Sequence, residues 1–181
     1  GITLASGVAH DLGNPPYGHS GEFAIQHWCK TLDVKKKIYA NDPVWKDFLY
    51  FDGNAQSFRM ACSAETRTGN AICFTAASAG ALVKYPKIVT EINDDDDSKK
   101  FDVFSIDKGL YSRIWKKLGL SERNHQRHPL SYLSEAADDI CYRVLDFEDA
   151  AVSGVISRDE VMRLFREGLS LSDETDDNKL P

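Results

Sequence analysis

The feature that most constrains the fold is a helical repeat of apolar residues between Leu130 and Ala150. In this stretch apolar side chains recur at steps of three and four residues, the spacing that places them on one face of an α-helix. The sequence therefore predicts a long amphipathic helix whose apolar face is packed. The members of this face are Leu130, Leu133, Ala137, Ile140, Cys141, Val144 and Phe147.

Shorter runs with the same spacing predict further helices along the chain. No run shows the two-residue alternation of a half-buried strand, so the predicted fold class is all-α. Segments rich in Gly, Pro or charge separate the helices, among them a turn at 13–18 and a predicted break at 42–45. The further helices are expected at residues 1–12, 20–32, 54–64, 71–84, 106–119 and 158–168.

The chain has 181 residues, of which 42% are apolar, enough for one domain with its own core. We assign residues 1–168 to this domain and residues 169–181 to a polar, acidic tail that has little to bury. The chain starts without Met, in the apolar pattern GITLASGVAHDLG. We therefore expect the domain to be incomplete at its N-terminus.

The net charge is −6, so the composition does not indicate a nucleic-acid-binding surface, and a polyanionic ligand would need a local basic pocket. The four cysteines form no CxxC pair, which favours reduced thiols. No secretory signal or membrane-length apolar run is found in the sequence. These features predict a cytoplasmic protein that does not enter a membrane.

His10 and Asp11 stand at the predicted end of the first helix, just before Gly13 and the pair Pro15 and Pro16. The two prolines must stop that helix, because proline lacks a backbone donor and disfavours helical geometry in the preceding residue. One imidazole nitrogen and one carboxylate suit a divalent metal. The alternative is an ordinary histidine at a helix end, hydrogen-bonded to its neighbours.

His19 and Glu22 follow the Gly- and Pro-rich turn. If a helix begins near Ser20, these side chains face each other across its first turn. A carboxylate that accepts from one ring nitrogen leaves the other nitrogen to activate or position water. The alternative is a capping histidine and a first-turn glutamate favoured by the helix dipole.

On the long helix, Asp138, Tyr142 and Asp146 recur at four-residue steps and share one stripe. Two carboxylates and a phenol beside an apolar face are costly to bury unless they bind something. The stripe is therefore either part of a binding site or a solvated polar face.

Four phrases in the sequence resemble those of deoxyguanosine triphosphate triphosphohydrolases of the HD superfamily, in the same order. The resemblance implies an HD-domain helical bundle that hydrolyses a deoxynucleoside triphosphate, dGTP or another, to the deoxynucleoside and inorganic triphosphate. It also implies a homo-oligomer in the full-length protein. The phrases are HDLGNPPYGHSGE (10–22), FDGNAQSFR (51–59), ALVKYP (81–86) and LSEAADDICYRVLDFEDA (133–150).

The resemblance also implies roles for individual residues. His10, Asp11 and Asp138 match the metal ligands of the family, which would hold one divalent ion such as manganese, magnesium, iron or zinc. His19 and Glu22 match its catalytic dyad. The family supplies one more metal-binding histidine from an earlier helix, and no residue before His10 offers it here.

For the substrate, the resemblance implies two groups of contacts. Tyr142 and Asp146 match positions at the deoxyribose, where a ring against the sugar and an acceptor for the 3′-hydroxyl would favour a deoxynucleotide. Asn54, Lys84 and Lys100 match groups near the triphosphate.

Two other functions stay open on the sequence. The same metal site would serve an HD phosphomonoesterase or phosphodiesterase that acts on other nucleotides. A chain without one of the ligands would also suit a non-catalytic nucleotide-binding module.

Overall fold

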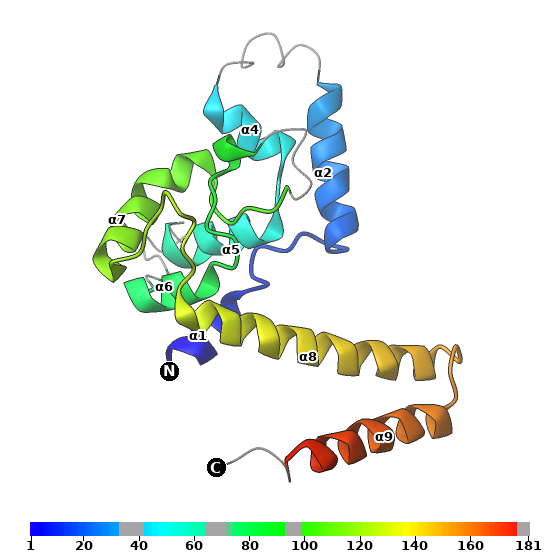
Figure 1. Cartoon of the computed structure of the whole chain (residues 1–181). Helices are drawn as coiled ribbons and strands as arrows, with labels where there is room; N and C mark the ends of the chain where they lie inside the picture. The colour runs from blue at the N-terminus through cyan, green and yellow to red at the C-terminus, as the bar shows by residue number, and fades with distance from the viewer. Residues whose placement is uncertain (33–41, 64–71, 73, 93–98, 177–181) are drawn as a thin grey trace. The chain divides into compact units, whose positions relative to one another are not determined.

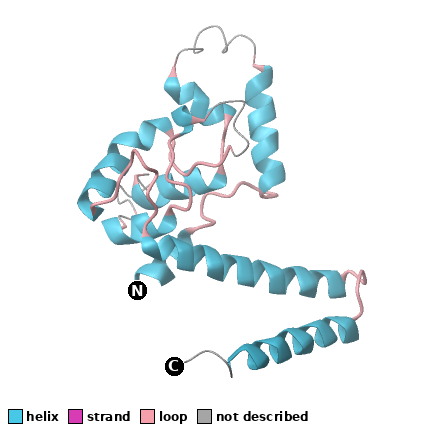
Figure 2. Cartoon of the chain, viewed as in Figure 1, coloured by secondary structure: helices cyan, strands magenta, loops and turns pink. Residues whose placement is uncertain are grey.

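The computed structural model describes residues 1–32, 42–63, 72, 74–92 and 99–176. Within these ranges every regular element is helical, as Figure 2 shows, and an isolated parallel bridge pairs Ile88 with Val103. The predicted all-α class is confirmed. None of the helices in this part of the chain has the length and apolar character needed to cross a membrane.

The chain divides into two compact units, residues 1–136 and 137–181. The long helix α8 begins in the first unit and continues into the second (Figure 1). The helices of the first unit are α1 (Ile2–Ala9), α2 (His19–Thr31), α4 (Pro43–Leu49), α5 (Gly53–Cys62), α6 (Ala76–Leu82), η1 (Val89–Glu91), η2 (Ser105–Asp107), α7 (Lys108–Leu118) and the start of α8 (Pro129–Val152).

The core of the first unit forms where α6 packs against α1, α5 and α7. Trp115 and Phe58 are fully buried in it, and the Tyr111 ring lies 4.4 Å from that of Trp115, centroid to centroid. Gly80 on α6 permits this packing, because a Cβ atom there would lie 2.7 Å from a methyl group of Leu118. Close packing of this kind leaves no room for an added carbon atom.

The predicted break at residues 42–45 is wrong, because helix α4 begins there. Asp42 is its N-cap, and its Oδ1 accepts a hydrogen bond from the Val44 N–H at 2.9 Å. Pro43 occupies the first helical position, where proline is favoured because its missing N–H is not needed. The pattern DP therefore marks the start of a helix here.

Helix α6 is shorter than predicted. The pattern favoured a helix over residues 71–84, but α6 begins at Ala76, where Thr75 caps it by accepting from the Ser78 N–H at 3.2 Å. Residues 71 and 73 lie outside the described part of the chain, as does the last residue of the helix predicted at 54–64.

The second unit contains the rest of α8 and helix α9 (Arg158–Asp176), joined by a turn in which Gly154 has a φ of +72°. The Phe147 and Phe165 rings meet edge to face, 5.6 Å apart. Both predicted helices are confirmed, and α9 runs past residue 168, where the polar tail was expected to begin.

The predicted burial of the apolar face of α8 is not found. Ile140 is 62% exposed and Val144 is 46% exposed, and Leu133, in the part of α8 that belongs to the first unit, is 58% exposed. The three- and four-residue spacing correctly indicated a helix with an apolar face, but spacing cannot indicate which surface covers that face.

Candidate functional site

The His10 ring lies directly after α1, with its orientation fixed by the helix. Its Nδ1 is 2.6 Å from the Gly7 carbonyl oxygen, and a carbonyl only accepts, so Nδ1 carries the hydrogen. Its Nε2 lies 3.3 Å from Oδ2 of Asp11. The ring thus presents its second nitrogen beside a carboxylate, with the tautomer set by a backbone carbonyl as in many metal-binding histidines.

The turn that carries this pair is fastened to α5. Ser57 Oγ donates to the His10 carbonyl at 2.6 Å and accepts from the Gly13 N–H at 2.9 Å. A Cβ atom at Gly13 would overlap the α5 backbone, so only glycine permits this approach. Within the turn, the Asn14 side-chain amide donates to Asp11 Oδ1 at 2.8 Å. Sequence reasoning missed Ser57, which is 44 residues from Gly13.

His19 and Glu22 form the predicted pair at the start of α2. His19 is the first residue of the helix, and its Nδ1 lies 2.8 Å from Glu22 Oε2. The His19 side chain is 90% exposed, whereas that of Glu22 is 11% exposed. The imidazole therefore stands in solvent while the carboxylate that orients it is held in the protein.

The second oxygen of Glu22 binds the start of α5. Its Oε1 accepts from the buried Gly53 N–H at 2.7 Å, so both carboxylate oxygens have a partner. Glycine at position 53 permits this close approach, because a Cβ atom there would overlap the Asn14 side chain and lie 2.8 Å from Glu22 Oε1. Since Glu22 accepts from His19 Nδ1, the Nε2 lone pair of a neutral His19 is available to a water molecule.

Asp52 lies beside this pair and was missed by sequence reasoning. It is the N-cap of α5, and its Oδ1 accepts from the Asn54 N–H at 2.8 Å and from the Ala55 N–H at 3.3 Å. Burial, together with the nearby charge of Glu22, raises the pKa of Asp52 from 3.8 to about 6. An aspartate before the first turn of a predicted helix is the signal that could have found it.

A hollow of about 320 Å³ opens beside Asp52. Aromatic rings, ammonium groups and polar side chains line it together, a mixture that suits a ligand with both a ring and an anionic group. The lining residues are Phe23, Gln26, Lys30, Tyr50, Asp52, Lys99 and Phe101.

The two lysines predicted near the triphosphate come from separate segments that meet at Tyr85. Lys100 Nζ lies 3.1 Å from the Tyr85 hydroxyl oxygen and 5.0 Å from the centre of its ring. Lys84 precedes Tyr85 directly, and both backbone N–H groups donate to Asp102. Asn54, the third predicted phosphate contact, lies in the first turn of α5, next to Gly53.

Asp138, Tyr142 and Asp146 lie on the α8 part of the second unit. Asp138 is half-buried, whereas Tyr142 and Asp146 are exposed. His10 and Asp11 belong to the first unit, and within the described ranges no group of three His, Cys, Asp or Glu side chains is close enough to hold a metal. The three-residue ligand set therefore stays a prediction, with only His10 and Asp11 adjacent.

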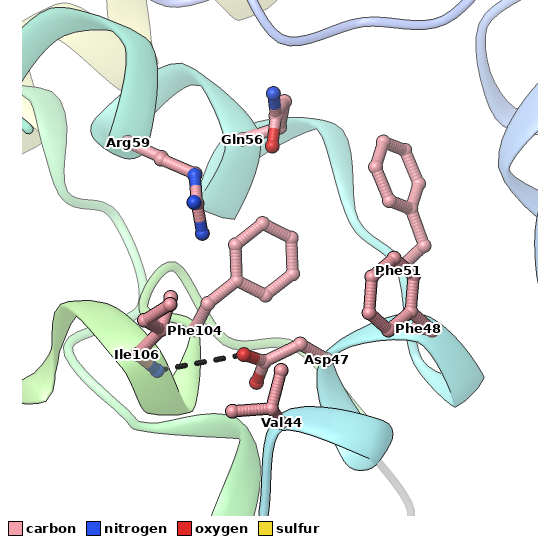
Figure 3. Close-up of a pocket in the computed structure, with 8 residues that line it drawn as sticks. All are labelled: Val44, Asp47, Phe48, Phe51, Gln56, Arg59, Phe104 and Ile106. Carbon is pink, nitrogen blue, oxygen red and sulfur yellow. Dashed lines mark hydrogen bonds between the residues drawn. The ribbon is translucent and has the colours of Figure 1, made fainter. Parts of the chain in front are cut away.

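A second hollow, of about 330 Å³, contains none of the predicted site residues (Figure 3). Asp47 lines it and is buried, and its carboxylate accepts from the Ser105 N–H at 2.7 Å and from Ser105 Oγ at 2.8 Å. Burial raises the pKa of Asp47. These bonds hold the start of η2, which gives this carboxylate a structural role.

No protein-family model matches the chain. Individual curated proteins do match it. A deoxyguanosinetriphosphate triphosphohydrolase-like protein of Listeria monocytogenes is 35% identical over 175 residues, which cover 92% of this chain and 37% of the relative. A protein of the same name from Pseudomonas aeruginosa is 37% identical over 169 residues, covering 90% of this chain and 38% of the relative.

A deoxyguanosinetriphosphate triphosphohydrolase of an Enterobacter species is 31% identical over 184 aligned residues, covering 85% of this chain and 35% of the relative. The chain therefore spans somewhat more than a third of the length of the curated relatives it matches.

Proposed function

We propose that this chain forms part of a metal-dependent hydrolytic site. The premise is that the chain is related to the deoxyguanosinetriphosphate triphosphohydrolase family over about nine tenths of its length. The protein containing it would hydrolyse dGTP or another deoxynucleoside triphosphate at the α-phosphorus. The products would be the deoxynucleoside and inorganic triphosphate.

The observation that carries this proposal is the network of His19, Glu22 and the Gly53 N–H. Glu22 accepts from both neighbours at 2.8 Å and 2.7 Å, which fixes its position, and it holds His19 by Nδ1. The exposed imidazole then receives a proton from water at Nε2, or holds that water in line with the phosphorus. The charge of Glu22 stabilises the imidazolium formed at that moment.

His10 and Asp11 would hold the divalent ion, with Asp138 as a further ligand in the assembled protein. The separation of 3.3 Å between His10 Nε2 and Asp11 Oδ2 fits two donors that share one cation. An ion held there, such as manganese, magnesium, iron or zinc, would neutralise phosphate oxygens and acidify water. The Gly7 carbonyl keeps His10 in the tautomer that such binding requires.

The remaining predicted residues would bind the substrate. Lys84, Lys100 and Asn54 would contact the triphosphate, where ammonium groups stabilise the negative charge that grows on the phosphoryl oxygens as water attacks the α-phosphorus. The bond that breaks joins this phosphorus to the 5′-oxygen, so the deoxynucleoside is the leaving group. Tyr142 and Asp146 would contact the deoxyribose by ring packing and by accepting from the 3′-hydroxyl.

Product analysis of the full-length protein tests this function. The protein is incubated with each deoxynucleoside triphosphate and added manganese or magnesium, and the phosphate products are separated by ion chromatography. We expect intact triphosphate in equal amount to the deoxynucleoside, and no signal when a chelator removes the metal.

Two other results would each overturn the proposal in a defined way. Release of orthophosphate or pyrophosphate alone would assign the site to a phosphohydrolase that cleaves other bonds. Binding of nucleotide without any product would assign it to a nucleotide-binding module.

A further inference from the structure

Asp102 is one of two buried aspartates in the described part of the first unit that leave one carboxylate oxygen without a hydrogen bond, the other being Asp107. Its side chain is 1% exposed. Oδ2 accepts two backbone N–H groups, from Lys84 at 2.5 Å and from Tyr85 at 2.8 Å. Oδ1 is buried, and no described residue hydrogen-bonds to it. Burying a polar oxygen without a hydrogen bond costs free energy, so the position of this carboxylate calls for an explanation.

The segment held by Asp102 is fixed at several further points. The Asp102 N–H donates to the Tyr85 carbonyl at 3.0 Å, so the two residues pair in both directions. The next carbonyl, that of Pro86, accepts from the Tyr111 hydroxyl at 3.1 Å and lies 3.1 Å from Nδ1 of His125. The backbone on which Lys84 stands therefore cannot shift without breaking bonds to three other parts of the chain.

Lys100 is attached to the same point through Tyr85. Its Nζ donates to the Tyr85 hydroxyl at 3.1 Å, and it lies two residues before Asp102 in the chain. The Asp102 carboxylate thus acts on both lysines. It holds the backbone of Lys84 and Tyr85 by their N–H groups, and the Tyr85 hydroxyl in turn holds the Lys100 ammonium group.

We propose that Asp102 is a positioning residue that sets the ammonium groups of Lys84 and Lys100 for the triphosphate of the substrate. The inference rests on the proposed function and adds to it a residue that touches no substrate. Fixing the backbone of Lys84 and the ammonium group of Lys100 before the ligand arrives removes part of the entropy that binding would otherwise cost.

The chemistry of Asp102 suits this role. Its pKa is raised to about 8, mainly by burial and also by the charge of Asp52, against the opposing hydrogen bond from the Tyr85 N–H. At neutral pH the carboxyl group is then largely protonated. It can hold the backbone through Oδ2 while leaving the charge of the two lysines available to phosphate.

The test uses the full-length protein, with dGTP for turnover and inorganic triphosphate as a probe of binding by calorimetry. We expect Asp102→Ala to raise KM and the Kd for triphosphate by about tenfold or more, with kcat changed by less than about threefold. Asp102→Asn keeps an oxygen acceptor of the same shape and should stay within about threefold of the wild-type Kd.

Asp47→Ala is the matched control, because Asp47 is also a buried aspartate that accepts backbone N–H groups, but it holds η2. Both alanine variants should lower the melting temperature, and only Asp102→Ala should weaken triphosphate binding. In a chain that already carries Lys84→Ala and Lys100→Ala, the added Asp102→Ala should change the Kd by less than about twofold, since coupled residues are not additive.

If Asp102→Ala does not fold, Tyr85→Phe tests the second connection by removing the hydroxyl that accepts from Lys100. It should raise the Kd for triphosphate by about threefold in the wild-type background and not at all in Lys100→Ala. Equal losses in Asp102→Ala and Asp47→Ala, or an unchanged Kd in Tyr85→Phe, would overturn the positioning role. Absence of turnover by the wild-type protein would instead overturn the proposed function.

Discussion

The two units hold their candidate site residues in different ways. In the first unit Glu22 is 11% exposed, and its two oxygens bind different helices. In the second unit Tyr142 is 52% exposed, on a helix whose apolar residue Ile140 is 62% exposed. The candidate site of the first unit is therefore held by packing and hydrogen bonds to other helices. The candidate residues of the second unit are placed only by their four-residue spacing along α8.

This difference predicts how each unit responds to substitution. The start of α5 binds Glu22 through Gly53, and the same helix buries Phe58 in the core, so chemistry and stability depend on the same element. On α8 the charged stripe and the apolar face are both largely solvent-exposed, so substitutions there should alter function with little effect on stability.

The largest effect is expected for Glu22→Gln in the full-length protein, if it has the proposed activity. The glutamine can still accept from the Gly53 N–H, but its NH2 group cannot accept from His19 Nδ1. We expect kcat to fall by about 10² to 10⁴ and KM to change by less than about threefold, measured as triphosphate release.

Glu91→Gln is the matched control for this prediction. Glu91 also accepts a backbone N–H with its carboxylate, that of Ile88 at 2.8 Å, and it is not among the candidate site residues. Its kcat should stay within about twofold of wild type. Unchanged turnover in Glu22→Gln would remove Glu22 from the mechanism.

The next largest effect is a difference between the two units in the free energy of unfolding lost on substitution. Phe58→Ala empties a fully buried position and should lower the free energy of unfolding by about 3–5 kcal/mol. Ile140→Ala removes an exposed side chain and should cost less than about 0.5 kcal/mol, measured by urea unfolding of the full-length protein. Equal losses in the two variants would mean that the apolar face of α8 is covered in solution, and the contrast between the units would not hold.

Gly53→Ala should have an intermediate effect, on stability and turnover together. The added methyl group would overlap Asn14 and press on Glu22, so we expect a loss of about 1–3 kcal/mol in unfolding free energy and a reduced kcat. Gly7→Ala is the control, because Gly7 lies in α1 with no atom within 4 Å of an added Cβ. It should raise stability by up to about 1 kcal/mol, since alanine favours a helix over glycine.

How much of this could be predicted from the sequence depends on the distance along the chain. The contact between His19 and Glu22 was predicted from a spacing of three residues. Helix α8 was predicted from the recurrence of apolar residues at three- and four-residue steps. The bonds from Glu22 to Gly53 and from Ser57 to Gly13 join residues 31 and 44 apart, and no local pattern encodes such a separation.

Two other misses have a different physical origin. Helix α4 was missed because proline both ends helices and starts them, and only the cap formed by Asp42 distinguishes the two. The exposure of the apolar face of α8 was missed because periodicity identifies a face and leaves its covering surface undetermined.

The smallest predicted effect concerns the pH dependence that Asp52 adds to the first unit. Its pKa is raised from 3.8 to about 6 in the folded protein, mainly by burial, so between these pH values the folded state binds more protons than the unfolded state. Wild-type stability should therefore fall as pH rises from about 4 to about 6 and be level above, relative to Asp52→Asn, which cannot ionise. We expect this difference in unfolding free energy to grow by about 1–2 kcal/mol across the window.

Because asparagine caps helices as well as aspartate does, Asp52→Asn should keep α5 intact. Asp42→Asn, at the exposed cap of α4, controls for the exchange of aspartate for asparagine itself. A flat difference between pH 4 and pH 6 would show that Asp52 ionises as easily in the folded protein as in the unfolded chain, and the start of α5 would then be as open to solvent as α8.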